Sequence, residues 1–589
     1  MNRTTPICLL LSTLTFAFVV LLTACGGGSS ISVPPPASYS ISVTMPNPSS
    51  LSAGGSSTST VTVTPAHSYT GTVTLSCAVS GAGNPSPTCS LKPNAVAITG
   101  SAPAASTLTF SAPDNAPNAS FTVTLSASDS NQQPPSDGSQ SLALATLAKI
   151  QHIIIVFQEN RTPDNLFQDP VLIANGADIV SSGKNSQGKT IHLASEPLSI
   201  DYDLSHKHDA FTDMCDLDTS SGICKMDGAD LVSITCGKNA TNCPPPNPQF
   251  QYVQASDVQP YFDMADQYTF GDHMFQTNEG PSFPAHQFII SGTSEPAAGS
   301  DLFVSENPFG VTNSGNNTGC TAPSAELVAI IDPSGSEASN DPIFPCFDHA
   351  TLTDELDSAG LTWRYYTAVA GSIWTSPNAI QHICEPVSQN GSLVCTGADW
   401  VNNVSVATQE NPAPILTDIA SGQLQQISWV IPSGANSDHP GDLAGGPSWV
   451  ASIVNAIGNS SYWSNTAIIV TWDDWGGWFD HVPPPKVITD GSSWGSGYVY
   501  GFRVPLVVIS PYAKPAHISS VTHDFGSVLN LIEHTFTLPS LGFADAYADD
   551  LSDCFNFGQT PITFKTINAP LKADFFLHDS RPPTPPDND

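Results

Sequence analysis

The sequence has 589 residues, which exceeds the ~250–300 at which a single hydrophobic core stops growing, so we expect at least two domains. Acidic residues outnumber basic ones by 52 to 16, and the formal net charge is -36 at pH 7. Such a charge repels phosphate backbones, so nucleic acid is not an expected partner.

The N-terminal segment, residues 1–25, is typical of an export signal. Arg3 supplies a positive charge before the apolar run 7–22, which is too short and wrongly flanked for an ordinary membrane span. The run ends in Leu-Thr-Ala-Cys, which resembles the lipobox of bacterial lipoproteins and puts Cys25 at the lipidated position. The alternative is a plain cleavage site with a chance cysteine. We expect an exported bacterial protein, periplasmic or at the cell surface, with a lipid on Cys25 as its membrane anchor.

Cysteine usage fits an oxidising compartment. Of the 13 cysteines, Cys8 and Cys25 belong to the N-terminal segment, which leaves eleven. Pairing between near neighbours leaves Cys554 over, and no zinc-like CxxC spacing occurs. The expected disulfides are Cys77–Cys89, Cys215–Cys224, Cys236–Cys243, Cys320–Cys346 and Cys384–Cys395.

Residues 26–37 form a Gly/Ser/Pro tether without the means to build a core. From 38 to 130, apolar residues alternate with Ser or Thr, as at Val61 and Val63. This period of two, interrupted by Pro, Gly and Asn turns, predicts a small all-β sandwich of the immunoglobulin-like kind. We expect residues 131–147 to be a linker.

From residue 148 onward the pattern changes to continuous apolar runs, which are typical of strands buried on both faces of a parallel sheet. The runs are 153–157, 427–431, 467–471 and 504–510, with helix-compatible stretches at 449–457 and 524–535. They predict an α/β domain over 148–580, with 581–589 as a disordered tail. Ligands of such sheets bind beyond the carboxyl ends of the strands.

Glu159 and Asn160 come just after the first of these runs. A carboxylate and an amide at the carboxyl end of a strand offer two hard oxygen ligands to a cation. Taken alone, the segment also fits a loop with capping side chains.

Asp473 and Asp474 follow the third run, ahead of Gly476 and Gly477. Adjacent carboxylates at the end of a buried strand repel each other, and an arrangement that keeps both ionised usually contains a metal ion. The two glycines allow other backbone to approach closely. A merely structural loop rarely concentrates Trp, Asp and His in this way.

Ser282 precedes an apolar stretch that fits the start of a helix. A serine at this position caps the helix in many proteins. The same position also favours anions, and therefore an alkoxide or a bound phosphate. The serine alone does not decide between these interpretations.

Together these segments resemble, in order, the bacterial phosphoesterase family, which contains phospholipases C and acid phosphatases. The matching segments are Glu159-Asn160-Arg161, Gly280-Pro281-Ser282, Asp473-Asp474-Trp475-Gly476-Gly477 with Asp480-His481-Val482-Pro483-Pro484, and Arg503-Val504-Pro505 with Ile509-Ser510-Pro511. The resemblance covers roughly 150–540 and implies an alkaline-phosphatase-like fold, with a mainly parallel sheet flanked by helices. The sandwich lies outside it.

The resemblance also implies site residues. A divalent metal ion of unknown identity is expected on Glu159, Asn160, Asp473, Asp474 and Ser282, and Ser282 is the expected nucleophile. His206 and His439 are expected to contact phosphate or protonate the leaving group, while His481 either does so or orients the aspartate loop. Thr162-Pro163 and Asp-Asp-Trp depart from the commoner family pattern, but neither removes an oxygen ligand.

The expected function is therefore that of an exported, metal-dependent phosphoesterase acting on a phospholipid diester or on a phosphate monoester. A different class of function also remains open: the chain is then a non-catalytic surface binding or adhesion lipoprotein with a degenerate phosphoesterase scaffold.

Overall fold

The computed structural model describes residues 34–583, except for 82, 239, 242, 311–316, 333–334, 338–340, 441–443 and 486–498. The expected export signal with Cys25, the tether up to residue 33, and residues 584–589 of the expected tail lie outside the described residues.

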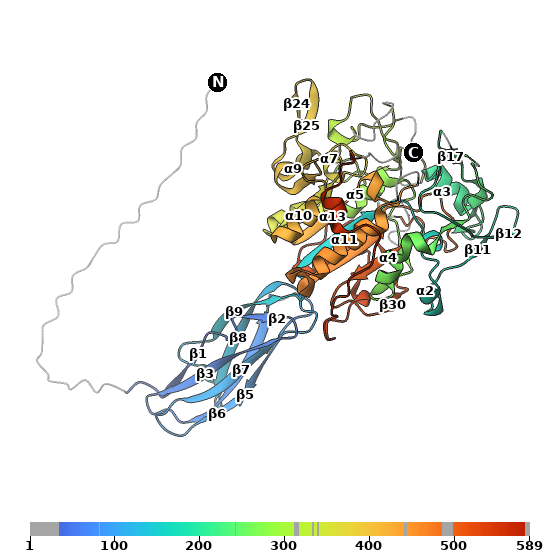
Figure 1. The fold of residues 1–589 in the computed structure, drawn as a ribbon. Coiled ribbons are helices and arrows are strands. Elements are labelled where there is room, and N and C mark those ends of the chain that lie inside the picture. Colours follow the sequence, from blue (N-terminus) through green and yellow to red (C-terminus); the bar gives the residue numbers. More distant parts are fainter. Residues whose placement is uncertain are drawn as a thin grey trace, which may run out of the picture.

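The N-terminal domain is an all-β sandwich, the elongated blue body in Figure 1. One sheet has the order β1 (Ser38–Val43), β3 (Ser56–Ala66), β7 (Ala104–Ser111), β5 (Thr88–Lys92). The other has the order β2 (Ser50–Ser52), β9 (Gln140–Leu147), β8 (Ala119–Asp129), β4 (Gly71–Ser80), β6 (Ala95–Ile98). Alternate side chains such as Val61 and Val63 are fully buried between the sheets, as the period of two predicts.

Two expected boundaries are wrong. The segment 131–147, expected to be a linker, contains strand β9, which pairs antiparallel with β8, so the sandwich extends to Leu147. The Gln, Pro, Ser and Gly residues of 131–139 supply the turn before this strand. At the other end, Arg581 was expected in a disordered tail, but its Nη2 donates to Asn436 Oδ1 at 2.9 Å.

The second domain is built on an eight-stranded mixed sheet, which confirms the α/β class. Its order is β26 (Val404–Val406), β23 (Trp363–Thr367), β27 (Ile427–Val430), β10 (His152–Gln158), β28 (Thr466–Trp472), β29 (Leu506–Ile509), β19 (Thr269–Gly271), β30 (His517–Ser519). All neighbours are parallel except at β29, which is antiparallel to β28 and to β19. The four predicted apolar runs are β10, β27, β28 and β29.

Helices cover this sheet in two groups. In one group α11 contacts α4, α10 and α13, and in the other α5 contacts α6, α7 and α12. Every residue of β10 from Ile153 to Gln158 is buried, which requires cover on both faces. The helices are α1 (Pro163–Leu166), α2 (Pro170–Ala174), α3 (His208–Cys215), α4 (Ala255–Ala265), α5 (Ser282–Ser291), α6 (Leu352–Ser358), α7 (Ser376–Ala379), α8 (Gln381–Cys384), α9 (Ala398–Asn403), α10 (Pro414–Ser421), α11 (Gly446–Gly458), α12 (Phe525–Phe536) and α13 (Ala573–Leu577).

Short two-stranded sheets lie in the segments that connect the main elements of the α/β domain. They are β11 (Ser182–Lys184) with β12 (Thr190–His192), β13 (Ala194–Glu196) with β18 (Gln251–Val253), β14 (Tyr202–Leu204) with β17 (Ile234–Cys236), β15 (Leu217–Asp218) with β16 (Ile223–Cys224), β20 (Met274–Phe275) with β31 (His523–Asp524), β21 (Phe303–Val304) with β22 (Ile330–Ile331), and β24 (Pro386–Gln389) with β25 (Ser392–Cys395). No helix within the described ranges is long and apolar enough to cross a membrane.

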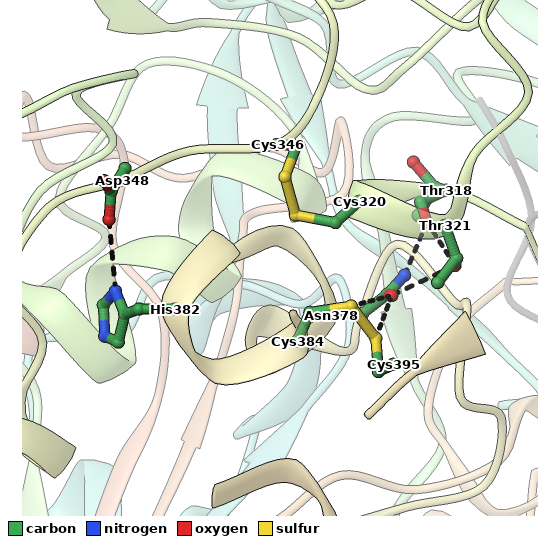
Figure 2. The surroundings of a disulfide bond; sticks show 9 residues. All are labelled: Thr318, Cys320, Thr321, Cys346, Asp348, Asn378, His382, Cys384 and Cys395. Carbon is green, nitrogen blue, oxygen red and sulfur yellow. Dashed lines mark hydrogen bonds and ion pairs between the residues drawn. A yellow bond between two sulfur atoms is a disulfide. The ribbon is translucent and has the colours of Figure 1, made fainter. Parts of the chain in front are cut away.

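All five expected disulfides are confirmed, and Cys554 is unpaired and buried. Figure 2 shows the bonds Cys320–Cys346 and Cys384–Cys395 close together, with Asn378 of α7 beside them. The Asn378 side chain accepts a hydrogen bond from Thr321 Oγ1 at 3.1 Å and donates to the carbonyl of Thr318. These contacts fix α7, which lies against α5.

Candidate active site

Sheet register brings the predicted oxygen ligands together. Strands β10 and β28 are parallel neighbours, and Gln158 pairs with Trp472 at their carboxyl ends. The next residues, Glu159 and Asp473, therefore leave the sheet side by side. The backbone N–H of Asn160 donates to Asp473 Oδ1 at 2.9 Å, which links the two loops directly. Glu159, Asn160, Asp473 and Asp474 are all completely buried.

Ser282 reaches the same cluster from α5. It is the first residue of the helix, and the residue at the cap position is Pro281, so the serine does not cap the helix. Its hydroxyl instead donates to Asp474 Oδ2 at 3.1 Å. The side chain is 1% exposed. Ser282 is thus a buried hydroxyl within a cluster of acidic groups at a helix N-terminus, and it is not the cap of that helix.

Gly476 allows the aspartate loop to lie against Asn160. Its φ is +62°, and an added Cβ would come within 2.4 Å of the Asn160 carbonyl oxygen. Asn160 itself has a φ of 58°, in the left-handed region that asparagine tolerates better than most residues. Both left-handed residues serve one close backbone approach at the centre of the site.

His206 lies in this cluster. Its Nδ1 is 2.9 Å from the carbonyl oxygen of Leu204, which only accepts, so Nδ1 carries a proton. Its Nε2 is 3.2 Å from Asn160 Nδ2 and 4.0 Å from Asp474 Oδ2. In the neutral ring Nε2 accepts the hydrogen bond from Asn160.

His439 lies beside His206, with ring centroids 6.4 Å apart. Its Nδ1 is 2.8 Å from the carbonyl oxygen of Pro440, so this nitrogen also carries a proton. Its ring also lies 6.0 Å from the ring of Trp374. The two histidines expected from the sequence are thus brought together.

His481 belongs to a separate network. Its Nδ1 lies 2.7 Å from Asp164 Oδ2, and its Nε2 lies 3.0 Å from Asp178 Oδ1. Arg503 holds Asp480 next to it through two hydrogen bonds of 2.9 and 3.0 Å. Burial alone would lower the pKa of His481, but the hydrogen bond and the charge of Asp164 raise it to about 9. A charged His481 and Arg503 thus tie the aspartate loop to Asp164, which lies in the segment after β10.

His286, for which no role was expected from the sequence, also lies in the cluster. It follows Ser282 by four residues on α5 and is fully buried. Its Nε2 lies 3.3 Å from Glu159 Oε1 and 3.8 Å from Asp473 Oδ2. Burial lowers its pKa to about 4, against the opposing charge of Asp473, so the ring is neutral near pH 7. No spacing motif identifies it; the available signal was helical periodicity from Ser282.

The buried carboxyl groups do not share one protonation behaviour. Burial, followed by the charge of Asp473, raises the pKa of Asp474 well above its usual range. Burial would raise the pKa of Asp473 as well, but the hydrogen bond with Glu159 acts in the opposite direction and the pKa is lowered. Only one member of the pair is therefore readily ionised unless a further positive charge is present.

The residues fit a divalent cation. Single ligand atoms of Glu159, His286 and Asp473 lie within 4.8 Å of one another. Asp473 Oδ2 and Asn160 Oδ1 are buried and accept no hydrogen bond from the described residues. A cation beside these oxygens satisfies them and offsets the repulsion between Asp473 and Asp474.

Fold and site together define an α/β protein with a buried serine inside a cluster of candidate cation ligands at the carboxyl edge of its sheet. The model of the phosphoesterase family matches residues 150–539, and the chain belongs to that family.

Similar proteins include phospholipase C A of Mycobacterium tuberculosis, at 29% identity over 42% of this chain and 52% of that protein. The hemolytic phospholipase C of Pseudomonas aeruginosa is 24% identical over 72% of this chain and 59% of that protein. The chain thus spans between half and two thirds of the length of these relatives. A solved protein of the alkaline phosphatase superfamily from Vibrio parahaemolyticus aligns with 11% identity over 50% of this chain and 64% of that one, at a TM-score of 0.27.

Proposed function

We propose that this chain is a metal-dependent phosphoesterase that hydrolyses phosphate esters with Ser282 as its nucleophile. The observation that carries the proposal is the Ser282 hydroxyl, buried and 3.1 Å from Asp474 within a cluster of cation ligands. The alternative of a non-catalytic binding protein is not favoured, because every expected oxygen ligand is present and buried in one place.

The proposed ligands are Glu159, Asn160, Asp473, Asp474 and Ser282. A divalent cation on these residues would lower the pKa of the serine hydroxyl and offset charge on the phosphate oxygens. Ser282 Oγ forms a bond to phosphorus while the bond from phosphorus to the leaving oxygen breaks. Water then cleaves the resulting phosphoserine and restores the hydroxyl.

The two histidines take different parts in this proposal. His206 accepts a hydrogen bond from Asn160 Nδ2 and thereby fixes the orientation of that amide. His439 has its Nδ1 engaged with Pro440, which leaves Nε2 to give a proton to the leaving oxygen.

The names of the relatives favour a phosphodiester substrate with a lipid part, since several are phospholipases C. A phosphate monoester is the second candidate. We further propose that the fold of 148–580 is alkaline-phosphatase-like, that the sandwich is immunoglobulin-like, and that the chain is exported and anchored through Cys25. Five disulfides support export.

The test compares purified wild-type protein with Ser282→Ala and Asp473→Ala on p-nitrophenyl phosphate and on p-nitrophenyl phosphorylcholine. Both variants and chelation of the wild type are expected to abolish turnover, because nucleophile and cation are lost. Ser291→Ala is the matched control, since Ser291 is equally buried at the far end of α5. Turnover like that of the wild type in Ser282→Ala contradicts the proposal, and the ratio of the two substrates ranks diester against monoester.

A further inference from the structure

We infer that His286 binds the cation directly, so that the site offers one imidazole nitrogen among its oxygens and prefers a transition-metal ion to Mg²⁺ or Ca²⁺. This inference rests on the proposed function, since it concerns the same cation. The inference adds His286 as a ligand that was not predicted from the sequence. It also names transition metals as the class of ion, which the oxygen ligands alone do not specify.

Helix geometry puts His286 at the site. Residues four apart on an α-helix lie on the same face, one above the other. Ser282 and His286 have this spacing on α5, and Ser282 already directs its hydroxyl at Asp474. The helix that supplies the nucleophile therefore directs an imidazole at the other carboxylates of the cluster.

The distances are those of ligands that share an ion. Two ligand atoms that each lie about 2.1 Å from one metal ion are roughly 3–4 Å apart. His286 Nε2 is 3.3 Å from Glu159 Oε1 and 3.8 Å from Asp473 Oδ2. Both carboxylates are ligands in the proposed function, so all three ligand atoms can surround the same metal ion.

A plain hydrogen bond from His286 to Glu159 does not account for this arrangement. Neither Nδ1 nor Nε2 of His286 has a hydrogen-bond partner among the described residues. The contact of 3.3 Å is therefore short enough for a hydrogen bond but does not have the direction of one. A buried ring nitrogen without a partner is costly, and a cation at Nε2 removes that cost.

Aromatic neighbours hold the imidazole in this orientation. The ring of Phe157 meets it edge to face at 4.8 Å, and Trp374 stacks beside it at 6.4 Å and 17°. Ser376 of α7 donates a hydrogen bond from its Oγ to the carbonyl oxygen of His286. The same helix lies beside the two disulfides shown in Figure 2. A side chain enclosed in this way keeps Nε2 toward the carboxylates without further adjustment.

One nitrogen ligand changes the expected metal preference. Carboxylate, amide and hydroxyl oxygens suit Mg²⁺, Ca²⁺ and Mn²⁺, whereas imidazole suits zinc, iron, copper and nickel. A mixed set therefore favours ions such as Zn²⁺ or Fe²⁺, and it also accepts Mn²⁺, which serves as a magnetic probe.

The decisive measurement is pulsed electron paramagnetic resonance on the full chain loaded with Mn²⁺. The wild type is expected to show the hyperfine coupling of a directly bound imidazole nitrogen, and His286→Gln is expected to lose it. His349→Gln is the matched control, because His349 is also buried, with its Nδ1 at the Glu295 carbonyl and its Nε2 without a partner. The control keeps the coupling. Absence of the coupling in the wild type, or its persistence in His286→Gln, overturns the inference.

Affinities provide a second readout. Loss of residues that merely orient a ligand already costs about 10–100-fold in metal affinity, so His286→Gln is expected to weaken Zn²⁺ binding by at least about 100-fold. Its effect on Ca²⁺ binding is expected to be much smaller, because Ca²⁺ prefers oxygen. An equal loss of affinity for Zn²⁺ and for Ca²⁺ contradicts a nitrogen ligand. If Mn²⁺ binds through oxygen alone, or if only Mg²⁺ or Ca²⁺ binds, this inference fails while the proposed function stands; if none of the four ions binds, the proposed function fails as well.

Discussion

His206 and His439 are neighbours with different hydrogen-bonding duties. Both rings use Nδ1–H for a backbone carbonyl, but Nε2 of His206 already faces Asn160 Nδ2. A nitrogen that accepts a hydrogen bond is not a proton donor. Among the two, His439 is therefore the proposed source of the leaving-group proton, and His206 acts through Asn160.

Replacement of His439 by Gln should depend on the leaving group. With an alkyl phosphate ester we expect kcat to fall by about 10²–10⁴-fold, the usual contribution of general acid catalysis. With p-nitrophenyl esters the fall should be much smaller, because p-nitrophenolate leaves without a proton. His206→Gln is the comparison, and it should affect both leaving groups alike. Equal losses in His439→Gln for both esters would assign the proton to another group.

At the scale of elements, the site depends on two loops that must touch. The loop after β28 lies on the backbone of Asn160 only because Gly476 has no Cβ. Beyond this contact, Arg503 holds Asp480 of the same loop, and His481 of the loop contacts Asp164 in the segment after β10. The close approach at Gly476 and the hydrogen bonds of Arg503 and His481 together place Asp473 and Asp474 opposite Ser282.

Gly476→Ala is expected to displace the aspartate loop and to lower kcat by at least about 100-fold, as misplacement by about 1 Å does in other active sites. The added Cβ would meet the Asn160 carbonyl oxygen at 2.4 Å. Gly422→Ala is a matched control, since Gly422 has a similar φ of +73° but open space around it. The control bears only the cost of a left-handed alanine, about 1–2 kcal/mol of stability. Steady-state kinetics and thermal melting of both variants decide the matter; similar kinetics in the two would contradict the steric argument.

Local patterns explain which elements could be predicted. The apolar runs identify β10, β27, β28 and β29 because strands buried on both faces need no alternation. Strand β9 was missed, because the Pro, Ser and Gly residues of its preceding turn obscured the short alternation of Leu142 and Leu144. His286 was missed for a different reason. Its meaning depends on how α5 sits above two strands that are more than 300 residues apart, which no local pattern encodes.

At the scale of the whole molecule, acidic groups dominate. The chain carries a net charge of -36 at pH 7, and several carboxyl groups are buried. Burial raises the pKa of Glu306 and of Glu533 to about 8. Other carboxylates behave oppositely: the hydrogen bond from His534 lowers the pKa of Asp550, while His517 and Lys514 lower that of Asp553 against the effect of burial. These opposed groups define a pH window of greatest stability.

The folded protein is expected to be more stable near pH 5 than near pH 8. Glu306 and Glu533 stabilise the fold fully below their ordinary pKa of 4.5, and this contribution is lost as pH rises toward about 8. The contribution of His481 is complete below 6.5 and is lost as pH rises through about 9. Asp550 and Asp553 stabilise the fold above their ordinary pKa of 3.8, so their contribution is already present at pH 5.

Thermal melting of the metal-free chain from pH 4 to 9 measures how the stability of the fold changes with pH. Repeating the series at about 1 M salt separates two causes, because salt screens exposed charge but affects buried groups much less. A difference that persists in salt identifies the buried groups, and a higher melting temperature at pH 8 than at pH 5 contradicts the assignment.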